Sequence, residues 1–173
     1  FGFAKNILVE EFLEGEEMSY FVISDGKNIK AFGTAQDHKR VGEGDKGKNT
    51  GGMGAYSPSR LFSEELEKKI LNKIIKPTLQ GLSDLNTNYK GFLYAGLMIV
   101  NNEPFLIEYN VRMGDPECQT LLPKIKTDLN QIFMACCKGK LSELNIEWYN
   151  SKSLCIVLCS KGYPDSFKKN VEI

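Results

Sequence analysis

Two long apolar runs joined by a short polar turn constrain the fold of this chain more than any other feature. The first run is YKGFLYAGLMIV, the second is PFLIEYN, and Asn101 and Asn102 begin the turn between them. This arrangement is typical of a β-hairpin made of two buried strands. A second pair of runs flanks Asp25 and Gly26, a common hairpin turn. Because hairpins are antiparallel, we expect an α+β fold with a largely antiparallel sheet and flanking helices.

Two other segments carry the pattern of amphipathic helices. In residues 63–82 the apolar positions fall roughly on one helical face, with Ser63 as N-cap and Pro77 expected to kink or end the helix. These apolar positions are Leu66, Ile70, Ile74 and Leu79. The second helix is predicted within TDLNQIFMACCKGKL, capped by Thr127 or Asp128 and stopped near Gly139.

The remaining segments are predicted to be strand or loop. A short strand spans residues 7–9, and a last strand lies within SLCIVLCSKGYP. Residues 36–56 are rich in glycine and charge, have no periodic apolar face, and are predicted to form one long loop. The chain begins at Phe1 and ends in KKNVEI, so we expect it to be a piece of a longer protein.

Composition argues against several classes of function. Lys+Arg and Asp+Glu each total 22, so no net positive field favours nucleic acid as a partner. No apolar run approaches membrane-spanning length, and we expect no membrane partner. The cysteines lack paired zinc spacing and His38 is the only histidine, which argues against a Cys/His metal site. Reduced thiols in a cytoplasmic protein are the simplest interpretation.

The segment LIEYNVRMGDPE places charged and turn-forming residues at the end of an apolar strand. Strand side chains alternate between faces, so Leu106, Glu108 and Asn110 are predicted to point the same way. A carboxylate and an amide oxygen on one face can both reach a hard cation such as Mg²⁺, which keeps other positions for water and phosphates. The alternative is that this pair lies on a solvated face.

Arg112 and the turn after it extend this group of polar residues. A guanidinium beside a metal site can hold phosphate oxygens in a bidentate fork. Asp115 and Glu117 add two carboxylates within the Gly-Asp-Pro-Glu turn. The alternative is a capped turn that leads into a helix, but such a turn does not need this concentration of acidic and amide groups beside an arginine.

The glycine-rich segment GKNTGGMGAY allows a second interpretation. Glycines let backbone N–H groups approach an anion closely, although the segment matches neither the P-loop nor the Rossmann fingerprint. Together with QDHKR just upstream, it is predicted to grip a charged substrate. A mobile surface loop is the alternative.

The opening segment VEEFLEGEE also leaves two interpretations open. It is either a surface charge cluster or a nucleotide clamp. In a clamp, backbone groups of residues 11–13 would face an adenine edge and a carboxylate would accept hydrogen bonds from ribose hydroxyls.

Four segments resemble glycinamide ribonucleotide synthetase, also called phosphoribosylamine–glycine ligase, in the order in which that family carries them. They are VEEFLEGEE, QDHKRVGEGDKGKNTGGMGAYSP, YKGFLYAGLM and IEYNVRMGDPE. The resemblance implies part of an ATP-grasp fold and the ATP-dependent ligation of glycine to 5-phosphoribosylamine, through a glycyl phosphate, in de novo purine biosynthesis. It also implies small-molecule substrates, and we expect a monomer or weak homodimer.

The resemblance assigns roles by position. Glu108 and Asn110 would be ligands of Mg²⁺ or Mn²⁺, and Arg112 and Asp115 would be catalytic residues beside the phosphates and glycine. The residues implied in ATP binding, with Glu17 at the ribose, are Glu10, Glu11, Phe12, Leu13 and Glu17. The residues expected to close on the substrates are Asp37, His38, Lys39, Arg40, Asn49, Thr50, Gly51 and Gly52.

The family's enzyme is longer than this chain, so these 173 residues alone are expected to be inactive. Residues 1–22 would be the end of a lid subdomain and the adenine hinge, 23–147 the central catalytic subdomain, and 148–173 the start of a C-terminal domain. The alternatives are another ATP-grasp carboxylate–amine ligase and a non-catalytic nucleotide-binding module.

Overall fold

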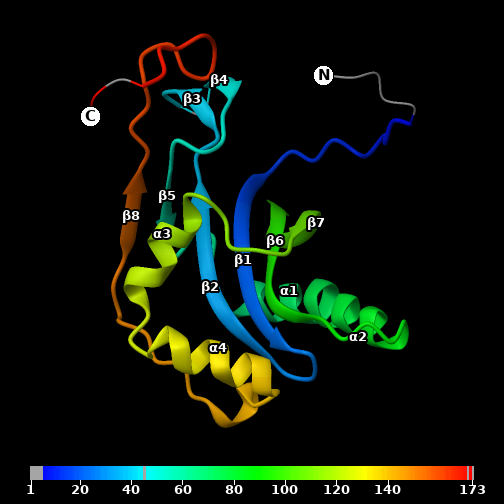
Figure 1. Ribbon diagram of the computed structural model, residues 1–173. Helices are drawn as coiled ribbons and strands as arrows, with labels where there is room; N and C mark the ends of the chain where they lie inside the picture. Colours follow the sequence, from blue (N-terminus) through cyan, green and yellow to red (C-terminus); the bar gives the residue numbers. More distant parts are fainter. Residues whose placement is uncertain (1–5, 45, 171, 173) are drawn as a thin grey trace.

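The computed structural model describes residues 6–44, 46–170 and 172. Its centre is a six-stranded sheet in the order β7-β6-β1-β2-β5-β8, in which every neighbouring pair is antiparallel (Figure 1). The strands are β1 Glu16–Asp25, β2 Ile29–Asp37, β5 Gly54–Ser57, β6 Lys90–Val100, β7 Glu103–Asn110 and β8 Ser153–Ile156. A separate hairpin of β3 Arg40–Gly42 and β4 Lys46–Asn49 lies beyond one end of the sheet.

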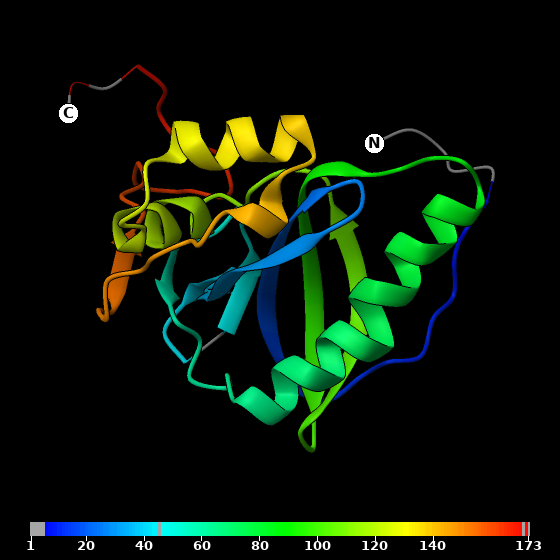
Figure 2. The same cartoon turned by 90° about the horizontal axis from the view of Figure 1, so that it is seen from below.

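Helices cover both faces of the sheet (Figure 2). On one face a continuous helical segment consists of α1 Glu64–Ile70, the π-helical turn η1 Leu71–Ile75 and α2 Lys76–Asp84. On the other face lie α3 Glu117–Leu121, the 3₁₀ turn η2 Leu122–Lys124, α4 Leu129–Lys138 and the 3₁₀ turn η3 Leu141–Glu143. The predicted α+β class, with a largely antiparallel sheet and flanking helices, is confirmed.

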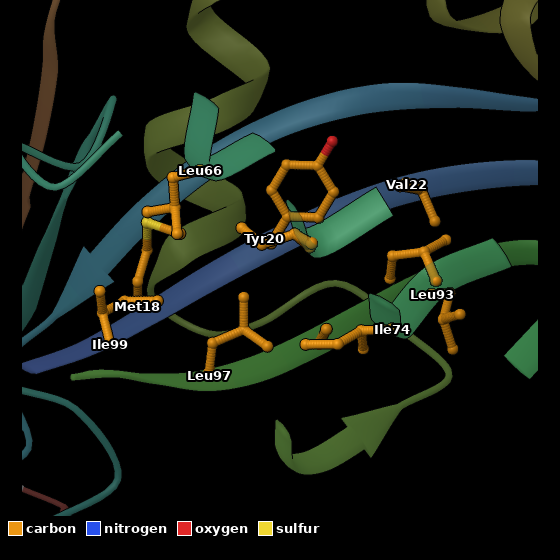
Figure 3. Packing of buried hydrophobic residues seen from close by; sticks show 11 residues of the cluster. Met18, Tyr20, Val22, Leu66, Ile74, Leu93, Leu97 and Ile99 are labelled. Carbon is orange, nitrogen blue, oxygen red and sulfur yellow. The ribbon is translucent and has the colours of Figure 1, made fainter. Parts of the chain in front are cut away.

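The central strand β1 supplies both hydrophobic cores, because its side chains alternate between the two faces. Met18, Tyr20 and Val22 pack with the helical segment α1–η1 in a first cluster (Figure 3). Phe21 and Ile23 point to the other face and belong to a second cluster with residues of α4. Burying a large apolar side chain contributes about 1.5–3 kcal/mol, so the position of β1 between the two helical layers is strongly specified.

Both predicted hairpins are confirmed. Asp25 ends β1, and the chain turns into β2 through residues 26–28. Asn101 and Asn102 connect β6 to β7 with φ angles of 50° and 62°. Asparagine tolerates this left-handed region, and positive φ at both central residues is the requirement of a type I′ hairpin turn.

The two predicted helices are confirmed with changes in detail. The Ser63 side chain accepts the backbone N–H of Leu66 at 3.1 Å, as an N-cap does. Pro77 does not end the first helix, because a π-helical turn precedes it and the helix continues to Asp84. The second helix is capped by Asp128, rather than Thr127, and ends at Gly139 with φ at 70°.

Two predicted backbone assignments are wrong. Residues 7–9 form no strand, and their side chains are more than 80% exposed. A strand needs a hydrogen-bonded neighbour, and none of the described residues pairs with this segment. Residues 36–56 are not one structureless loop, because they contain β3, β4 and most of β5. The predicted last strand is β8, which pairs with β5 in the main sheet. The predicted subdomain boundaries stay a prediction.

Asp25 joins the β1–β2 turn to the helical layer on the second face. Its buried carboxylate accepts backbone N–H groups from Lys27 at 2.9 Å, Asn28 at 2.7 Å and Leu141 at 2.9 Å. Burial would raise the pKa of Asp25, but the hydrogen bonds from Asn28, Lys27 and Leu141 outweigh it and lower the pKa to about 2.

We predict that Asp25→Ala lowers the free energy of unfolding by about 2 kcal/mol, because three N–H groups lose their acceptor. The folded pKa lies below the ordinary value of 3.8, so the contribution of Asp25 is fully present above about pH 4 and is lost as pH falls through 2. Urea denaturation at several pH values measures both effects. The matched control is Asp84→Ala. It removes an exposed carboxylate that accepts from the Gln80 side chain, and should change stability by less than about 0.5 kcal/mol.

Candidate functional site

A cleft of about 650 Å³ opens where β1 begins, at the end of the sheet drawn uppermost in Figure 1. The N-terminal segment contributes Phe12 and Leu13 to its lining, and the start of β1 contributes Glu17. The end of β2 and the segment after it contribute Asp37, His38, Lys39, Arg40 and Asn49. The structure therefore brings together two groups of predicted site residues that lie at least 20 positions apart in the chain.

A smaller cavity of about 170 Å³ extends this cleft toward β7. Glu17, Asp37 and Lys39 line both spaces, and Glu108 closes the far side of the smaller one. Glu11 lines a further hollow beside Phe12 and Leu13. Glu10 is exposed in the same N-terminal segment.

Glu108 and Asn110 share a face of β7, as predicted. The amide nitrogen of Asn110 donates to the Glu108 carboxylate at 3.1 Å, so both groups lie on one side. Leu106 does not point the same way, so that prediction is wrong. Gly96 of β6 pairs with Glu108 and the next residue, Leu97, pairs with Leu106, so Ile107 is left without a partner on β6. This bulge turns Leu106 to the face of the first hydrophobic cluster, to which Leu97 belongs.

The donor set of Glu108 and Asn110 fits a divalent ion such as Mg²⁺ or Mn²⁺. A carboxylate and an amide oxygen are hard ligands, and both side chains reach solvent. Gly96 leaves room for Glu108, because a Cβ there would lie 3.3 Å from the Glu108 Cγ. Over the described ranges no group of three His, Cys, Asp or Glu residues could hold a metal. An ion on Glu108 and Asn110 would leave positions for water and for phosphate oxygens.

Lys39 lies among carboxylates of three strands. Its ammonium group is 2.6 Å from the Glu17 carboxylate, and Asp37 and Glu108 are close enough to act on its charge. Burial would lower the pKa of Lys39, but the hydrogen bond to Glu17 and the charges of Asp37 and Glu108 raise it. Lys39 therefore stays protonated, and it occupies the Glu17 carboxylate that is predicted to accept from a ribose.

The carboxyl group of Asp37 in this cleft has a raised pKa. Burial, together with the negative charges of Glu117 and Glu17, raises the pKa of Asp37 to about 6, although Lys39 opposes the shift. A carboxyl group with this pKa changes its protonation state close to neutral pH, which is unusual outside functional sites.

The glycine-rich segment is ordered by its own hydrogen bonds. The N–H groups of Thr50 and Met53 donate to the carbonyls of Lys39 and His38, at 2.7 and 2.8 Å. The N–H groups of Gly51 and Gly52 donate to the hydroxyls of Tyr163 and Thr50, at 3.0 and 3.1 Å. In this conformation these four N–H groups are not available to an anion, contrary to the interpretation of the segment as a backbone cradle.

The same segment packs on the turn that follows β7. A Cβ at Gly52 would lie 2.6 Å from Pro116 Cδ, so only glycine permits this contact. In the turn, Asp115 accepts from the Gln119 side chain at 2.6 Å and Arg112 donates to the Met113 carbonyl at 3.1 Å. Both side chains are exposed, so the charged groups of the turn remain accessible.

Sequence reasoning missed three residues that lie buried beneath this turn. Glu117 was recognised only as one carboxylate of a turn, and Ser19 and Tyr94 were assigned no role beyond their strands. In the structure the Ser19 and Tyr94 hydroxyls lie 3.1 and 2.8 Å from one Glu117 carboxylate oxygen. No local pattern reveals this contact, because the residues come from β1, β6 and α3 and are 23 to 98 positions apart.

A family model identifies the group of proteins to which these features belong. The model of the phosphoribosylglycinamide synthetase, ATP-grasp (A) domain, matches residues 1–118. The chain belongs to this family. Membership confirms the predicted ATP-grasp fold and implies the use of ATP.

Individual members of the synthetase family agree with this assignment. The phosphoribosylamine–glycine ligase of Vigna unguiculata is 49% identical over 96% of this chain and 54% of its own length. The corresponding protein of Agrobacterium fabrum is 49% identical over 96% of this chain and 40% of its own length. The crystal structure of the ligase from Thermotoga maritima superimposes with a TM-score of 0.82 at 33% identity, covering 92% of this chain and 40% of that one. The chain thus spans about half or less of each relative.

No helix among the described residues is both long enough and apolar enough to cross a membrane.

We predict that the Asp37 carboxyl group of this synthetase-family domain titrates near pH 6 when neither metal nor nucleotide is present. Lys39→Ala should raise that midpoint further, because Lys39 is the positive charge that lowers the pKa of Asp37. Carboxyl ¹³C chemical shifts followed against pH measure the midpoint, and Asp37→Asn identifies the resonance. A midpoint near 4 in the wild-type protein would contradict the described environment of Asp37.

Proposed function

We propose that the complete protein ligates glycine to 5-phosphoribosylamine, forming glycinamide ribonucleotide while ATP is converted to ADP and phosphate, as a step of de novo purine biosynthesis. One observation carries the proposal. In a chain of the synthetase family, Glu108 lines a cavity that shares Glu17, Asp37 and Lys39 with the cleft lined by the N-terminal segment. The names of the relatives over nearly the whole chain support the same reaction.

The reaction needs activation of a carboxylate, which is a poor electrophile. Phosphorylation of glycine by ATP gives a glycyl phosphate, and the amine of phosphoribosylamine then attacks its carbonyl carbon and releases phosphate. A divalent ion held by Glu108 and Asn110 would neutralise charge on the phosphates of ATP. Arg112 would hold phosphate oxygens through its guanidinium group, and Asp115 would orient the ammonium group of glycine.

ATP would lie along the N-terminal segment. We propose that Phe12 and Leu13 contact adenine and that Glu17 accepts from the ribose after Lys39 turns from it toward the phosphates. Five of the residues predicted to close on the substrates, at positions 37–40 and 49, line this cleft, and Gly52 packs on the turn after β7. Their closure would protect the acyl phosphate from water. No protein nucleophile is needed for either step.

The other expectations belong to the same proposal. We propose a cytoplasmic enzyme that acts on small molecules, as a monomer or weak homodimer, with residues 1–22, 23–147 and 148–173 in three parts of a longer chain. The 173 residues alone should lack activity. Another ATP-grasp carboxylate–amine ligase is the nearest alternative, because the Glu-x-Asn pair is not specific to one acid.

ADP formation in the complete enzyme tests the reaction. We predict that ADP appears only when glycine and phosphoribosylamine are both supplied with ATP, measured with a coupled assay. Replacing glycine with alanine or aspartate should abolish the signal. ADP formation with another acid would favour the alternative ligase, and no ADP formation with any acid would favour a non-catalytic module.

Glu108→Ala and Asn110→Ala should each reduce kcat by at least about 100-fold in the complete enzyme, because each removes one of two protein ligands of the ion. The expected fold is unchanged, since both side chains reach solvent. The matched control is Glu103→Ala on the same strand, which breaks exposed ion pairs with Lys69 and Lys73 and should keep wild-type activity. Wild-type rates at limiting Mg²⁺ in either site variant would refute the metal assignment.

A further inference from the structure

The segment between β7 and α3 is held at both ends by one residue, through strand pairing at its start and through a side chain at its end. This 111–116 turn carries Arg112 and Asp115. At its start, Asn110 is the direct cross-strand partner of Tyr94. At its end, the Tyr94 hydroxyl donates to the Glu117 carboxylate at 2.8 Å. Tyr94 therefore fixes the distance between the two ends of the turn.

A buried hydrogen-bond network completes this contact. Glu117, Ser19 and Tyr94 are 2%, 3% and 6% exposed. The Ser19 hydroxyl lies 3.1 Å from the Glu117 oxygen that Tyr94 also approaches, and 2.9 Å from the Tyr94 hydroxyl. A carboxylate removed from water needs such donors, because its desolvation is otherwise unfavourable by several kcal/mol. The geometry of the network is therefore tightly specified.

The network lies directly beside the two candidate metal ligands. Ser19 pairs with Gly96 across β1 and β6, and Gly96 pairs with Glu108 across β6 and β7. Side chains of directly paired residues lie on the same face of a sheet. Ser19 and Glu108 therefore lie in one row of paired residues that runs across the strands, and Tyr94 and Asn110 lie in the next row on that face. Each candidate ligand thus has a member of the network in its own row.

The turn leaves no room for the Glu117 carboxylate to move. A Cβ at Gly114 would lie 2.3 Å from one of its oxygens, so the carboxylate rests directly against the backbone of the turn. Gly52 also packs against the turn, at Pro116. Displacing Glu117 would therefore displace the backbone that carries Arg112 and Asp115.

We propose that Glu117, Tyr94 and Ser19 are positioning residues that hold the 111–116 turn in register with Glu108 and Asn110. They act through the turn and need no contact with substrate. The inference rests on the proposed function for its catalytic meaning, but its structural content is independent of which acid the enzyme uses. Removing one hydroxyl should loosen the turn and weaken the binding of a metal–nucleotide complex.

The chain offers a matched control on the opposite face of the same sheet. The buried hydroxyl of Tyr20 donates to Glu67 at 2.9 Å, which repeats the tyrosine–carboxylate contact of Tyr94 and Glu117 without the turn. Burial and the adjacent carboxylate raise the pKa of each tyrosine, so both hydroxyls stay protonated donors. Tyr20→Phe and Tyr94→Phe therefore remove the same group at similar burial.

The test compares these two variants, with Glu117→Gln as a second probe of the network, in the complete protein. Mn²⁺ binding in the presence of ADP is measured by electron paramagnetic resonance, and hydrogen exchange is measured for residues 111–118. We expect Tyr94→Phe to weaken Mn²⁺ binding about tenfold, which is the lower end of the loss in metal affinity when a residue that orients metal ligands is replaced. We also expect faster hydrogen exchange in the turn. Tyr20→Phe should leave both unchanged.

Equal behaviour of Tyr94→Phe and Tyr20→Phe in either measurement would overturn the inference, even if both variants lose stability. Wild-type protein that does not bind Mn²⁺ with ADP would overturn it together with the metal assignment. Failure of the proposed reaction is recognised separately. In that case wild-type protein binds Mn²⁺ and ADP and shows the predicted difference between variants, but forms no ADP from ATP with glycine and phosphoribosylamine.

Discussion

The two-sided burial of β1 is the constraint on which the rest of the structure depends. Every residue from Met18 to Asp25 is buried, and the alternate side chains pack against helices on opposite faces. A slip of one residue would exchange the two faces and destroy both cores. The same register places Ser19 against Glu117 and aligns it with Glu108, so the packing of the core also sets the geometry of the site.

The charges around Lys39 bear on the proposed binding of a metal–nucleotide complex. Glu17, Asp37 and Glu108 lie around Lys39, and Glu117 adds negative charge behind them. Polyphosphate would be repelled by so many carboxylates unless positive charge entered with it. In the proposed reaction a divalent ion on Glu108 and Asn110 supplies that charge, and Lys39 and Arg112 are placed to contribute theirs. In the proposed reaction the carboxylates around Lys39 would thus favour a metal–nucleotide complex over free ATP.

Features that depend on neighbouring residues were predictable from the sequence. The hairpin turns at Asp25 and at Asn101 were recognised because their residues tolerate the required backbone angles, and Ser63 was recognised as a cap by its type and position. Features set by a partner strand were not predictable. The bulge at Ile107 reversed the orientation expected for Leu106, because the pairing with β6, rather than the sequence of β7, decides where alternation is interrupted.

The sequence by itself determined the antiparallel hairpins, the helix caps and the proximity of Glu108 to Asn110, because each follows from two to four adjacent residues. Its motifs also indicated the family, since several of them occur in a fixed order. Only the tertiary structure decided that Lys39 pairs with Glu17, that the N–H groups of residues 50–53 are occupied, and that Tyr94 and Ser19 hold Glu117. The contacts of Glu117 with Ser19 and Tyr94 and of Lys39 with Glu17 depend on where β1 lies between its neighbours, and the contact of Gly51 with Tyr163 joins segments 112 positions apart, so no local sequence pattern reveals them.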